Sequence, residues 1–360
     1  MVVSLCLLGA GAPDARQAFR QALPGYRFVF PRDHASHPEF KTEWWYYSGH
    51  LRTDNGDEFG YQLTFFRVGV EPSLRQDSRS RWAVRDLYLA HFAISDLRQR
   101  RFLYWERRSR GALGSAGASS ANLKVWNGDW AASANETAHH LTATVEGYAI
   151  DLTLSPTKRP AIHGRDGVSQ KAEGAGRASH YYSLSRMATT GTVIVAGRAQ
   201  KVTGSSWMDH EFGSNQLTAS QVGWDWFALQ LENGTELMLY QLRLKGGTPD
   251  PHSSGSLIGP DGRVEHLPLK AFSLEPQEFW GSPKSGGGYP IRWRVRVPDR
   301  RIDLTVAAAF PDQELDTSKS TQVTYWEGSV TVVGSAEGQP LSGFGYLEMT
   351  GYAAPFRQPL

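Results

Sequence analysis

Short segments rich in aromatic and β-branched residues recur along almost the whole sequence, separated by clusters of glycine, asparagine, aspartate and proline. Such segments are typical of β-strands, and the clusters between them are typical of turns. The clearest segments cover residues 43–51, 58–70, 87–95, 140–154, 180–187, 192–202, 224–231, 236–244, 289–297, 301–310, 325–334 and 343–352. Helical periodicity is convincing only over residues 15–23. Many strands joined by close turns predict an all-β protein made of antiparallel barrels or sandwiches.

Two segments, half a chain apart, follow one plan. Residues 44–67 and 224–243 each contain an aromatic-rich strand that ends in leucine, an Asn-Gly turn, and a strand containing Tyr-Gln-Leu. Asn-Gly suits the positive φ angles of a tight hairpin turn. A repeat at this distance favours two similar β domains in tandem. We expect one barrel over residues 25–216 and a second over residues 217–360, with the boundary within 215–221.

The first residues, MVVSLCLLGAGA, form a short apolar segment that ends in Ala-Gly-Ala. This pattern resembles a signal peptide that lacks its basic region, so we expect residues 1–12 to be a truncated leader and the mature protein to be periplasmic or secreted. The single cysteine, Cys6, lies in this segment, so the rest of the chain forms no disulfide and no cysteine metal site. No other apolar run approaches the roughly 20 residues of a membrane span.

Composition argues against several functional classes. The net charge of +2 does not favour nucleic acid as a partner, and the basic runs 98–110 and 298–301 are interpreted as solvated edges or loops. The sequence contains no G-x-S-x-G, phosphate-binding loop or dinucleotide fingerprint. An aromatic content of 12% instead indicates aromatic cores or a concave apolar site. The low-complexity segments 109–122 and 165–180 are predicted as long loops, either functional lids or disordered.

The segment SSWMDHEFGSNQL, residues 205–217, places Asp209, His210 and Glu211 between large aromatic residues. If this segment is a strand, alternate side chains point to opposite faces. Asp209 and Glu211 then share a face with Trp207, while His210 points the other way. Three adjacent residues on one strand do not converge on a single ion, so neither a metal nor another cofactor is predicted.

A carboxyl group at position 209 in aromatic surroundings has a chemical use. Burial disfavours the charged form and raises the pKa, and a carboxylic acid that is neutral near pH 7 can donate a proton to a weakly basic substrate. The faces of Tyr182, Trp207, Trp224 and Trp226 could stabilise a developing cation. The alternative is that Asp209 caps a turn or pairs with an arginine while the rings fill a barrel.

Other polar residues within the aromatic segments receive structural interpretations. His50 and His91 are predicted to be hydrogen-bonded core histidines, and Glu43 is predicted to be a solvent-facing group at the end of a strand. Glu327 and Glu348 are predicted to be edge or pairing residues that close the second domain.

Several motifs together resemble a known family. These are KTEWWYYSGHL, GYQLTFFR, HFAISD, WMDHEFG, GWDWFALQL, YWEGSV and GYLEMTGY, within residues 31–352. They resemble the AttH/CrtC-like family of lipocalin-like proteins, which is related to carotenoid 1,2-hydratase and often described as predicted secreted hydrolases. The resemblance implies an all-β fold of two tandem lipocalin-like (calycin) antiparallel β-barrels.

The resemblance also implies a set of site residues. The hydratase branch has a His-x-aromatic followed about 27 residues later by aromatic-x-Asp, which matches His180, Tyr182, Trp207 and Asp209 as catalytic residues. Tyr182 stands where the branch has tryptophan, and Trp207 stands where it has tyrosine. Trp45, Tyr47, Glu211, Trp224 and Trp226 are the corresponding candidates for ligand binding.

The hypothesis that follows is a cofactor-free hydration of an alkene in an apolar, isoprenoid or lipid-like ligand. Asp209 would protonate the alkene, Tyr182 and Trp207 would shield the cation, and His180 would orient Asp209 or the water. Glu211 would be a reserve acid or base, and His210 would be structural. The alternative is a non-catalytic carrier of a small apolar molecule in the cell envelope. Hydrolysis is less favoured, because the sequence contains no nucleophile motif.

Overall fold

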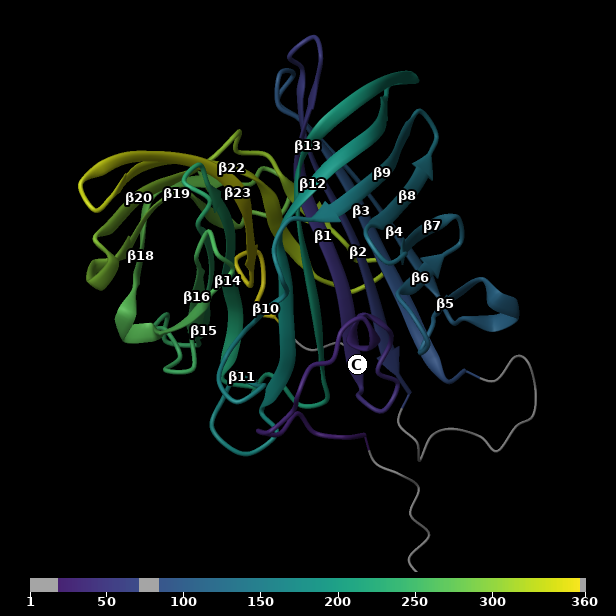
Figure 1. Cartoon of the computed structure of the whole chain (residues 1–360), viewed down its shortest axis with the longest axis horizontal. Coiled ribbons are helices and arrows are strands. Elements are labelled where there is room, and N and C mark those ends of the chain that lie inside the picture. Colours follow the sequence, from purple (N-terminus) through teal and green to yellow (C-terminus); the bar gives the residue numbers. More distant parts are fainter. Residues whose placement is uncertain (1–18, 71–83, 357–360) are drawn as a thin grey trace, which may run out of the picture.

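The computed structural model describes residues 19–70 and 84–356, and within these residues the chain forms two large antiparallel sheets (Figure 1). The first sheet has the strand order β4-β3-β2-β1-β13-β12-β9-β8-β7-β6-β5, and β10 and β11 pair with β12. Its strands are β1 (Thr42–Thr53), β2 (Glu58–Gly69), β3 (Asp86–Asp96), β4 (Arg101–Ser109), β5 (Ala116–Ala118), β6 (Lys124–Asn127), β7 (Trp130–Ala134), β8 (His139–Val145), β9 (Tyr148–Pro156), β10 (Ala161–Ile162), β11 (Ser169–Gln170), β12 (Ala178–Val195) and β13 (Arg198–Gly213).

The second sheet has the order β17-β16-β15-β14-β23-β22-β20-β19-β18, and β21 pairs with β22. Its strands are β14 (Gln221–Leu231), β15 (Glu236–Leu244), β16 (Ser254–Ile258), β17 (Val264–Pro268), β18 (Ser273–Gly281), β19 (Gly288–Val297), β20 (Ile302–Ala308), β21 (Glu314–Asp316), β22 (Thr324–Ala336) and β23 (Gln339–Thr350). Short 3₁₀ turns are η1 (Arg32–His34), η3 (Ala112–Gly114), η4 (Leu269–Ala271) and η5 (Pro298–Arg300).

The two sheets repeat one topology. Each begins with a hairpin, β1–β2 or β14–β15, whose first strand also pairs with the last strand of the same sheet, β13 or β23. These hairpins contain the two Asn-Gly turns, in which Gly56 and Gly234 have φ angles of 82° and 79°. Only the glycine of each turn has a positive φ, which is the conformation that a residue without Cβ adopts at no steric cost.

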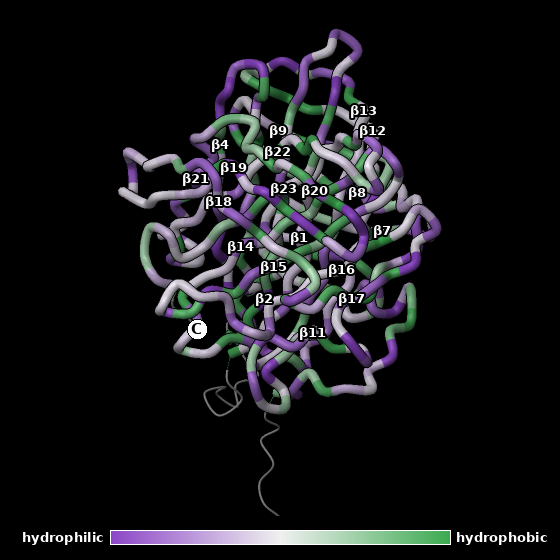
Figure 2. Tube along the Cα trace, turned by 90° about the vertical axis from the view of Figure 1, so that its left-hand side faces the viewer, coloured by the Kyte–Doolittle hydropathy of each residue, from purple (hydrophilic) through white to green (hydrophobic). Residues whose placement is uncertain are grey.

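Each sheet curls around an apolar core of its own. The first core contains Trp45, Tyr47, Tyr182 and Met208, and the second contains Phe227, Trp293, Trp326 and Leu347. In the first barrel β6 packs against β2, β3 and β4, which brings the far ends of the sheet together. Figure 2 shows hydrophobic stretches along the crossing strands and hydrophilic stretches mainly in the outer loops.

A third apolar cluster joins the two barrels. It contains Tyr46, Tyr181 and Trp207 from the first sheet, and Trp226, Tyr240 and Tyr346 from the second. The outer faces of β1, β12 and β13 are therefore buried against the second sheet, while their inner faces are buried in the first barrel. These strands have no solvent-facing side at their centres.

The fold class expected from the sequence is confirmed, since the described residues form two curled antiparallel sheets in tandem. The predicted helix is wrong where it can be checked, because residues 19–23 are not helical and Ala22 forms a β-bridge with Gly176. The rest of that segment, the proposed leader 1–12 and Cys6 lie outside the described residues. Among the described residues, no helix is long and apolar enough to cross a membrane.

The two low-complexity segments contain more structure than the loops expected from sequence. Segment 109–122 includes η3 and the edge strand β5, and segment 165–180 includes β11 and the start of β12. The second segment also brings Lys171 to the site described below. The basic run 98–110 largely forms β4, the edge strand of the first sheet, in agreement with its interpretation as an edge.

Candidate active site

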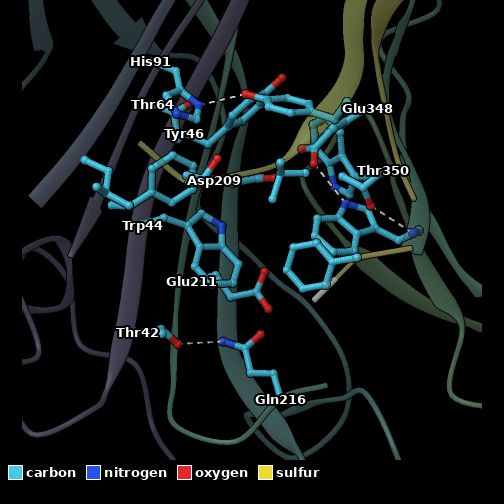
Figure 3. Close-up of a pocket in the computed structure, with 18 of the residues that line it drawn as sticks. Thr42, Trp44, Tyr46, Thr64, His91, Asp209, Glu211, Gln216, Glu348 and Thr350 are labelled. Carbon is cyan, nitrogen blue, oxygen red and sulfur yellow. Dashed lines mark hydrogen bonds between the residues drawn. The ribbon is translucent and has the colours of Figure 1, made fainter. Parts of the chain in front are cut away.

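A cavity of about 280 Å³ lies between the two barrels, near the lower end of the ~300–1,000 Å³ typical of ligand sites. Strands β1, β2, β3 and β13 line it from the first sheet, and β14, β15, β22 and β23 line it from the second. Its apolar wall includes Trp44, Phe66, Trp224, Trp226, Leu242 and Phe356. Figure 3 shows Trp44, Asp209, Glu211 and Glu348 together around this space. The site is thus an interface cavity and not the interior of either barrel.

Asp209 reaches this cavity from the middle of β13 and is 4% exposed. Tyr181 donates a hydrogen bond to its Oδ2 at 2.6 Å, and the Trp207 indole donates to its Oδ1 at 2.6 Å. The Ser183 hydroxyl also donates to Oδ1. A carboxylate offers about four lone-pair positions, so these donors leave roughly one for a proton.

Two opposing effects set the acidity of Asp209. Burial raises the pKa, while the hydrogen bonds from Ser183, Tyr181 and Trp207 lower it, and the net result is a pKa of about 7. No arginine pairs with Asp209 among the described residues. The carboxyl group is therefore suited to both giving and accepting a proton near neutral pH.

The donors to Asp209 are themselves held in place. The Trp226 indole of β14 donates to the Tyr181 hydroxyl at 3.1 Å, so a residue of the second sheet supports the first-sheet acid. The rings of Trp207 and Trp226 meet edge to face with centroids 6.5 Å apart. The acid thus depends on both barrels for its geometry.

Glu211 lies two residues farther along the same face of β13. Lys171 Nζ is 3.1 Å from its Oε1, and the Ser179 hydroxyl donates to the same oxygen. Although burial opposes it, the Glu211 carboxylate raises the pKa of Lys171 above its usual range. Lys171 also lies over the Tyr240 ring, 4.1 Å from its centroid. Glu211 is consequently half of a buried ion pair at the wall of the cavity.

The second sheet contributes two further carboxyl groups, Glu327 and Glu348, which stand directly opposite each other on β22 and β23. Burial raises the pKa of Glu348 to about 7, although the Trp224 indole donates to its Oε1 at 3.0 Å. Burial and the neighbouring Glu348 raise the pKa of Glu327 well above its usual range. Both were expected to be edge or pairing residues. They do pair across strands, but both line the cavity, where Glu327 is fully buried and Glu348 is half-buried.

His91 occupies the end of the cavity formed by β3. Its Nδ1 is 2.8 Å from the Tyr325 hydroxyl and its Nε2 is 2.8 Å from the Ser320 hydroxyl. Burial lowers the pKa of His91 to about 3, which keeps the ring neutral. His50, outside the cavity lining, shares a hydrogen bond of 2.9 Å with the carbonyl of Gly345. His91 is buried and His50 is half-buried, and each makes hydrogen bonds that link the two sheets.

The structure brings together only part of the predicted site. Asp209, Glu211, Trp224 and Trp226 line the cavity, and Trp207 lies beside it as a hydrogen-bond donor. Four predicted residues face elsewhere, namely Trp45, Tyr47, His180 and Tyr182.

Tyr182 and His180 lie on the face of β12 that points away from Asp209, which belongs to the neighbouring strand β13. The Tyr182 hydroxyl is 2.6 Å from His34 Nδ1 inside the first barrel, and His180 Nδ1 donates to the Gly167 carbonyl at 2.7 Å. The residue between them, Tyr181, is the one that reaches Asp209. The predicted shielding by Tyr182 and orientation by His180 are therefore not supported by their positions.

Trp45 and Tyr47, which were expected to bind the ligand, also face away from the cavity. They point into the first barrel, whereas their neighbours Trp44 and Tyr46 line the cavity. Strict alternation along β1 was correct, but the face toward the ligand site is the other one. Sequence reasoning missed Tyr46 and Tyr181 and did not place Glu348 at the site, and the only signal was single polar residues within strongly aromatic strands.

His210 points away from the cavity, as the alternation predicted. Its Nε2 is 2.9 Å from Glu43 Oε1 inside the first barrel. Glu43 was expected to face solvent, but it is fully buried and also bonded to Arg67 and His37.

Ligating atoms of His37, Glu43 and His210 lie within 4.8 Å of one another. Although burial opposes it, hydrogen bonds to Asp33 and Glu43 raise the pKa of His37 to about 9, so this ring carries a positive charge at neutral pH. Arg67 Nε also donates to Glu43 Oε2 at 3.0 Å. With a cationic imidazole and a guanidinium on the shared carboxylate, this cluster forms a buried ion-pair network in the structure.

The fold and cavity define a class of protein with two tandem β-barrels and a buried, acid-lined site between them. Residues 21–352 match the family model described as AttH-like, and the chain belongs to this family. It is similar to the crystal structure of an AttH-type protein from Nitrosomonas europaea, with 30% identity, a TM-score of 0.84, and coverage of 93% of this chain and 100% of the other.

Two further relatives carry enzyme names. The dehydratase asqC of Emericella nidulans is 22% identical over 275 residues, which are 74% of this chain and 77% of that protein. The crystal structure of kievitone hydratase from Nectria haematococca has a TM-score of 0.69 and 17% identity, covering 94% of this chain and 98% of the other. The latter likeness concerns the fold.

Proposed function

We propose that this protein is a cofactor-free hydratase or dehydratase that moves a proton between Asp209 and a carbon atom of an apolar, isoprenoid-type alkene. The observation that carries the proposal is the buried Asp209 carboxyl group, which lines an aromatic cavity and has a pKa of about 7. The names of two relatives, a dehydratase and a hydratase, support the same reaction class.

In hydration, the Asp209 proton forms a new C–H bond with the π electrons of the alkene, leaving a cation on the other carbon. Water then attacks this cation and releases a proton. The donors Tyr181, Ser183 and Trp207 stabilise the carboxylate that Asp209 becomes. The faces of the tryptophans that line the cavity favour the cation. Dehydration follows the same steps in reverse.

Replacing Asp209 with asparagine tests this role. Asp209→Asn keeps the shape of the side chain but removes the transferable proton, so turnover should fall by about 10²–10⁴-fold. The substrates would be the monoterpene pair myrcene and linalool, incubated in ¹⁸O-labelled water with products followed by mass spectrometry. Binding, followed by quenching of the cavity tryptophans, should change little.

The matched control is Glu278→Gln, an acid-to-amide change at an exposed position of β18, which should leave turnover unchanged. Full activity of Asp209→Asn would overturn the acid assignment. Binding of the probes by the parent protein without any turnover would instead favour a carrier of small apolar molecules.

A further inference from the structure

Three buried polar atoms, each on a residue that lines the cavity, have no hydrogen-bond partner within 3.5 Å among the described residues. They are Tyr46 Oη, Gln62 Oε1 and Glu327 Oε1. Glu327 is only 1% exposed, and a buried polar group without a partner destabilises the folded state. Three such atoms around one cavity indicate that the site is built to receive a polar group of a ligand, or a water molecule.

The strand register places Tyr46 beside the proposed acid, because it is the direct partner of Asp209 across β1 and β13. Tyr46 stands opposite Thr64 in the β1–β2 pair, and Gln62 lies two residues from Thr64 on the same face. Burial, and then the charge of Glu327, raise the pKa of Tyr46 well above its usual range, so these two side chains interact closely, although no hydrogen bond within 3.5 Å joins them. Water needs two to four polar partners, and these residues supply both donors and acceptors.

We propose that Glu327 is a second catalytic residue, and that Tyr46 and Gln62 bind with it the oxygen atom that is added to the substrate in hydration and lost in dehydration. This proposal rests on the proposed function of Asp209. It assigns the carbon atom to Asp209 on β13 and the oxygen atom to Tyr46, Gln62 and Glu327 on β1, β2 and β22. We call this second group the oxygen end, and it adjoins Asp209 because Tyr46 pairs with Asp209 across the strands.

The proton balance of the reaction requires such a group. In hydration, Asp209 gives its proton to carbon, water oxygen forms the C–O bond, and the proton released by water passes to the Glu327–Glu348 pair. In dehydration, the pair returns a proton to the departing hydroxyl, the C–O bond breaks to give water, and the Asp209 carboxylate takes a proton from carbon. Solvent restores the starting protonation states after the product leaves.

The neighbouring Glu348 allows Glu327 to give and accept a proton. The two carboxyl groups stand opposite each other on neighbouring strands, so like-charge repulsion keeps them from ionising together. Their pKa values are both raised, with Glu348 at about 7, so the pair holds one proton over a neutral pH range. It can therefore release a proton to a hydroxyl or accept one from water.

Binding of a matched pair of ligands tests the oxygen end without requiring turnover. Linalool is a tertiary terpene alcohol, and myrcene is the corresponding alkene without the hydroxyl group. We expect the parent to bind linalool at least about tenfold more tightly than myrcene, a difference of about 1.4 kcal/mol. Glu327→Leu should remove this preference and leave myrcene affinity unchanged, as measured by tryptophan quenching and calorimetry.

Tyr46→Phe is a second variant that removes only the unpartnered hydroxyl, so it tests the same end if Glu327→Leu does not fold. It should weaken linalool binding several-fold and leave myrcene binding unchanged. Glu278→Leu, at an exposed position, is the control. An unchanged preference for linalool in both cavity variants would overturn this inference alone. Failure of the parent to bind either terpene would overturn both proposals.

Deuterium exchange separates the two carboxyl roles during catalysis. In D₂O, Glu327→Gln should still let Asp209 add deuterium to the alkene and return the cation to alkene, but net hydration should fall about 100-fold or more. Asp209→Asn should lose exchange and hydration together. Exchange that falls in parallel with hydration in Glu327→Gln would contradict a role at the oxygen end while leaving Asp209 as the acid.

Discussion

At the scale of single residues, the acidity of Asp209 is a balance between burial and hydrogen bonding. Burial alone favours a permanently neutral acid, and three donors alone favour a permanent carboxylate. Together they give a pKa of about 7. The residues that provide this balance are the neighbours of Asp209 across β12 and along β13, which shows how a β-sheet positions donors on one face.

The pH dependence of the proposed reaction follows from this value. Hydration requires protonated Asp209, so its kcat/KM should fall as the pH rises through about 7. Dehydration requires the carboxylate, so its rate should fall as the pH drops through the same range. Measuring kcat/KM for the hydration of myrcene and for the dehydration of linalool checks this. Two rates that rise or fall together as the pH changes would contradict the role of Asp209.

At the scale of secondary-structure elements, the central strands are buried on both faces. On β1, Trp45 and Tyr47 enter the first barrel, while Trp44 and Tyr46 face the second sheet. On β12 and β13 the same division separates Tyr182 and His210 from Tyr181 and Asp209. A strand of this kind carries large or polar residues at every position, so its sequence does not distinguish the two faces.

The β22–β23 pair should make stability depend on pH through Glu348. Its folded pKa of about 7 lies above its ordinary value of 4.5, so the folded state binds more protons between these values. The contribution of protonated Glu348 to stability is thus fully present below pH 4.5. It is lost as the pH rises through about 7, which lowers the unfolding free energy by up to about 3 kcal/mol.

Glu348→Gln removes this titration. The parent should therefore lose up to about 3 kcal/mol more unfolding free energy than Glu348→Gln between pH 4.5 and pH 8, as measured by urea denaturation. The exposed Glu278→Gln variant should behave like the parent. Identical pH dependence of the unfolding free energy in the parent and Glu348→Gln would show that folding does not raise the pKa of the Glu348 carboxyl group.

At the scale of the whole molecule, the two barrels are joined through buried polar contacts as well as aromatic packing. Glu236 of β15 accepts hydrogen bonds from Lys158 at 2.7 Å and from Arg186 of β12 at 2.6 Å. Gln230 of β14 donates to the Ser185 carbonyl at 2.7 Å, and His163 contacts the Ser256 hydroxyl at 2.8 Å. These contacts fix the relative position of the sheets and therefore the shape of the cavity.

Breaking this network should destabilise the whole protein. Glu236→Gln leaves the buried ammonium of Lys158 and the guanidinium of Arg186 without their shared anion. We expect a loss of about 3–5 kcal/mol in unfolding free energy, measured by urea denaturation. Glu278→Gln should change this quantity by less than about 0.5 kcal/mol. A similarly small effect of Glu236→Gln would mean that the network contributes little to the interface.

The sequence alone determined the fold class and the local geometry of the strands. Aromatic and β-branched runs predicted the strands, the Asn-Gly turns marked the two equivalent hairpins, and the period of two separated Asp209 and Glu211 from His210. For Asp209 it left two interpretations open, a buried acid in aromatic surroundings or a residue that caps a turn or pairs with an arginine.

Only the tertiary structure decided which residues meet at the site. The cavity exists because the second barrel covers the outer face of the first, and this contact joins residues more than 100 positions apart, such as Asp209 and Glu348. Local periodicity describes each strand separately and contains no information about which neighbour covers a face. The pairing of Glu327 with Glu348 and the roles of Tyr46 and Tyr181 therefore follow from how the barrels pack.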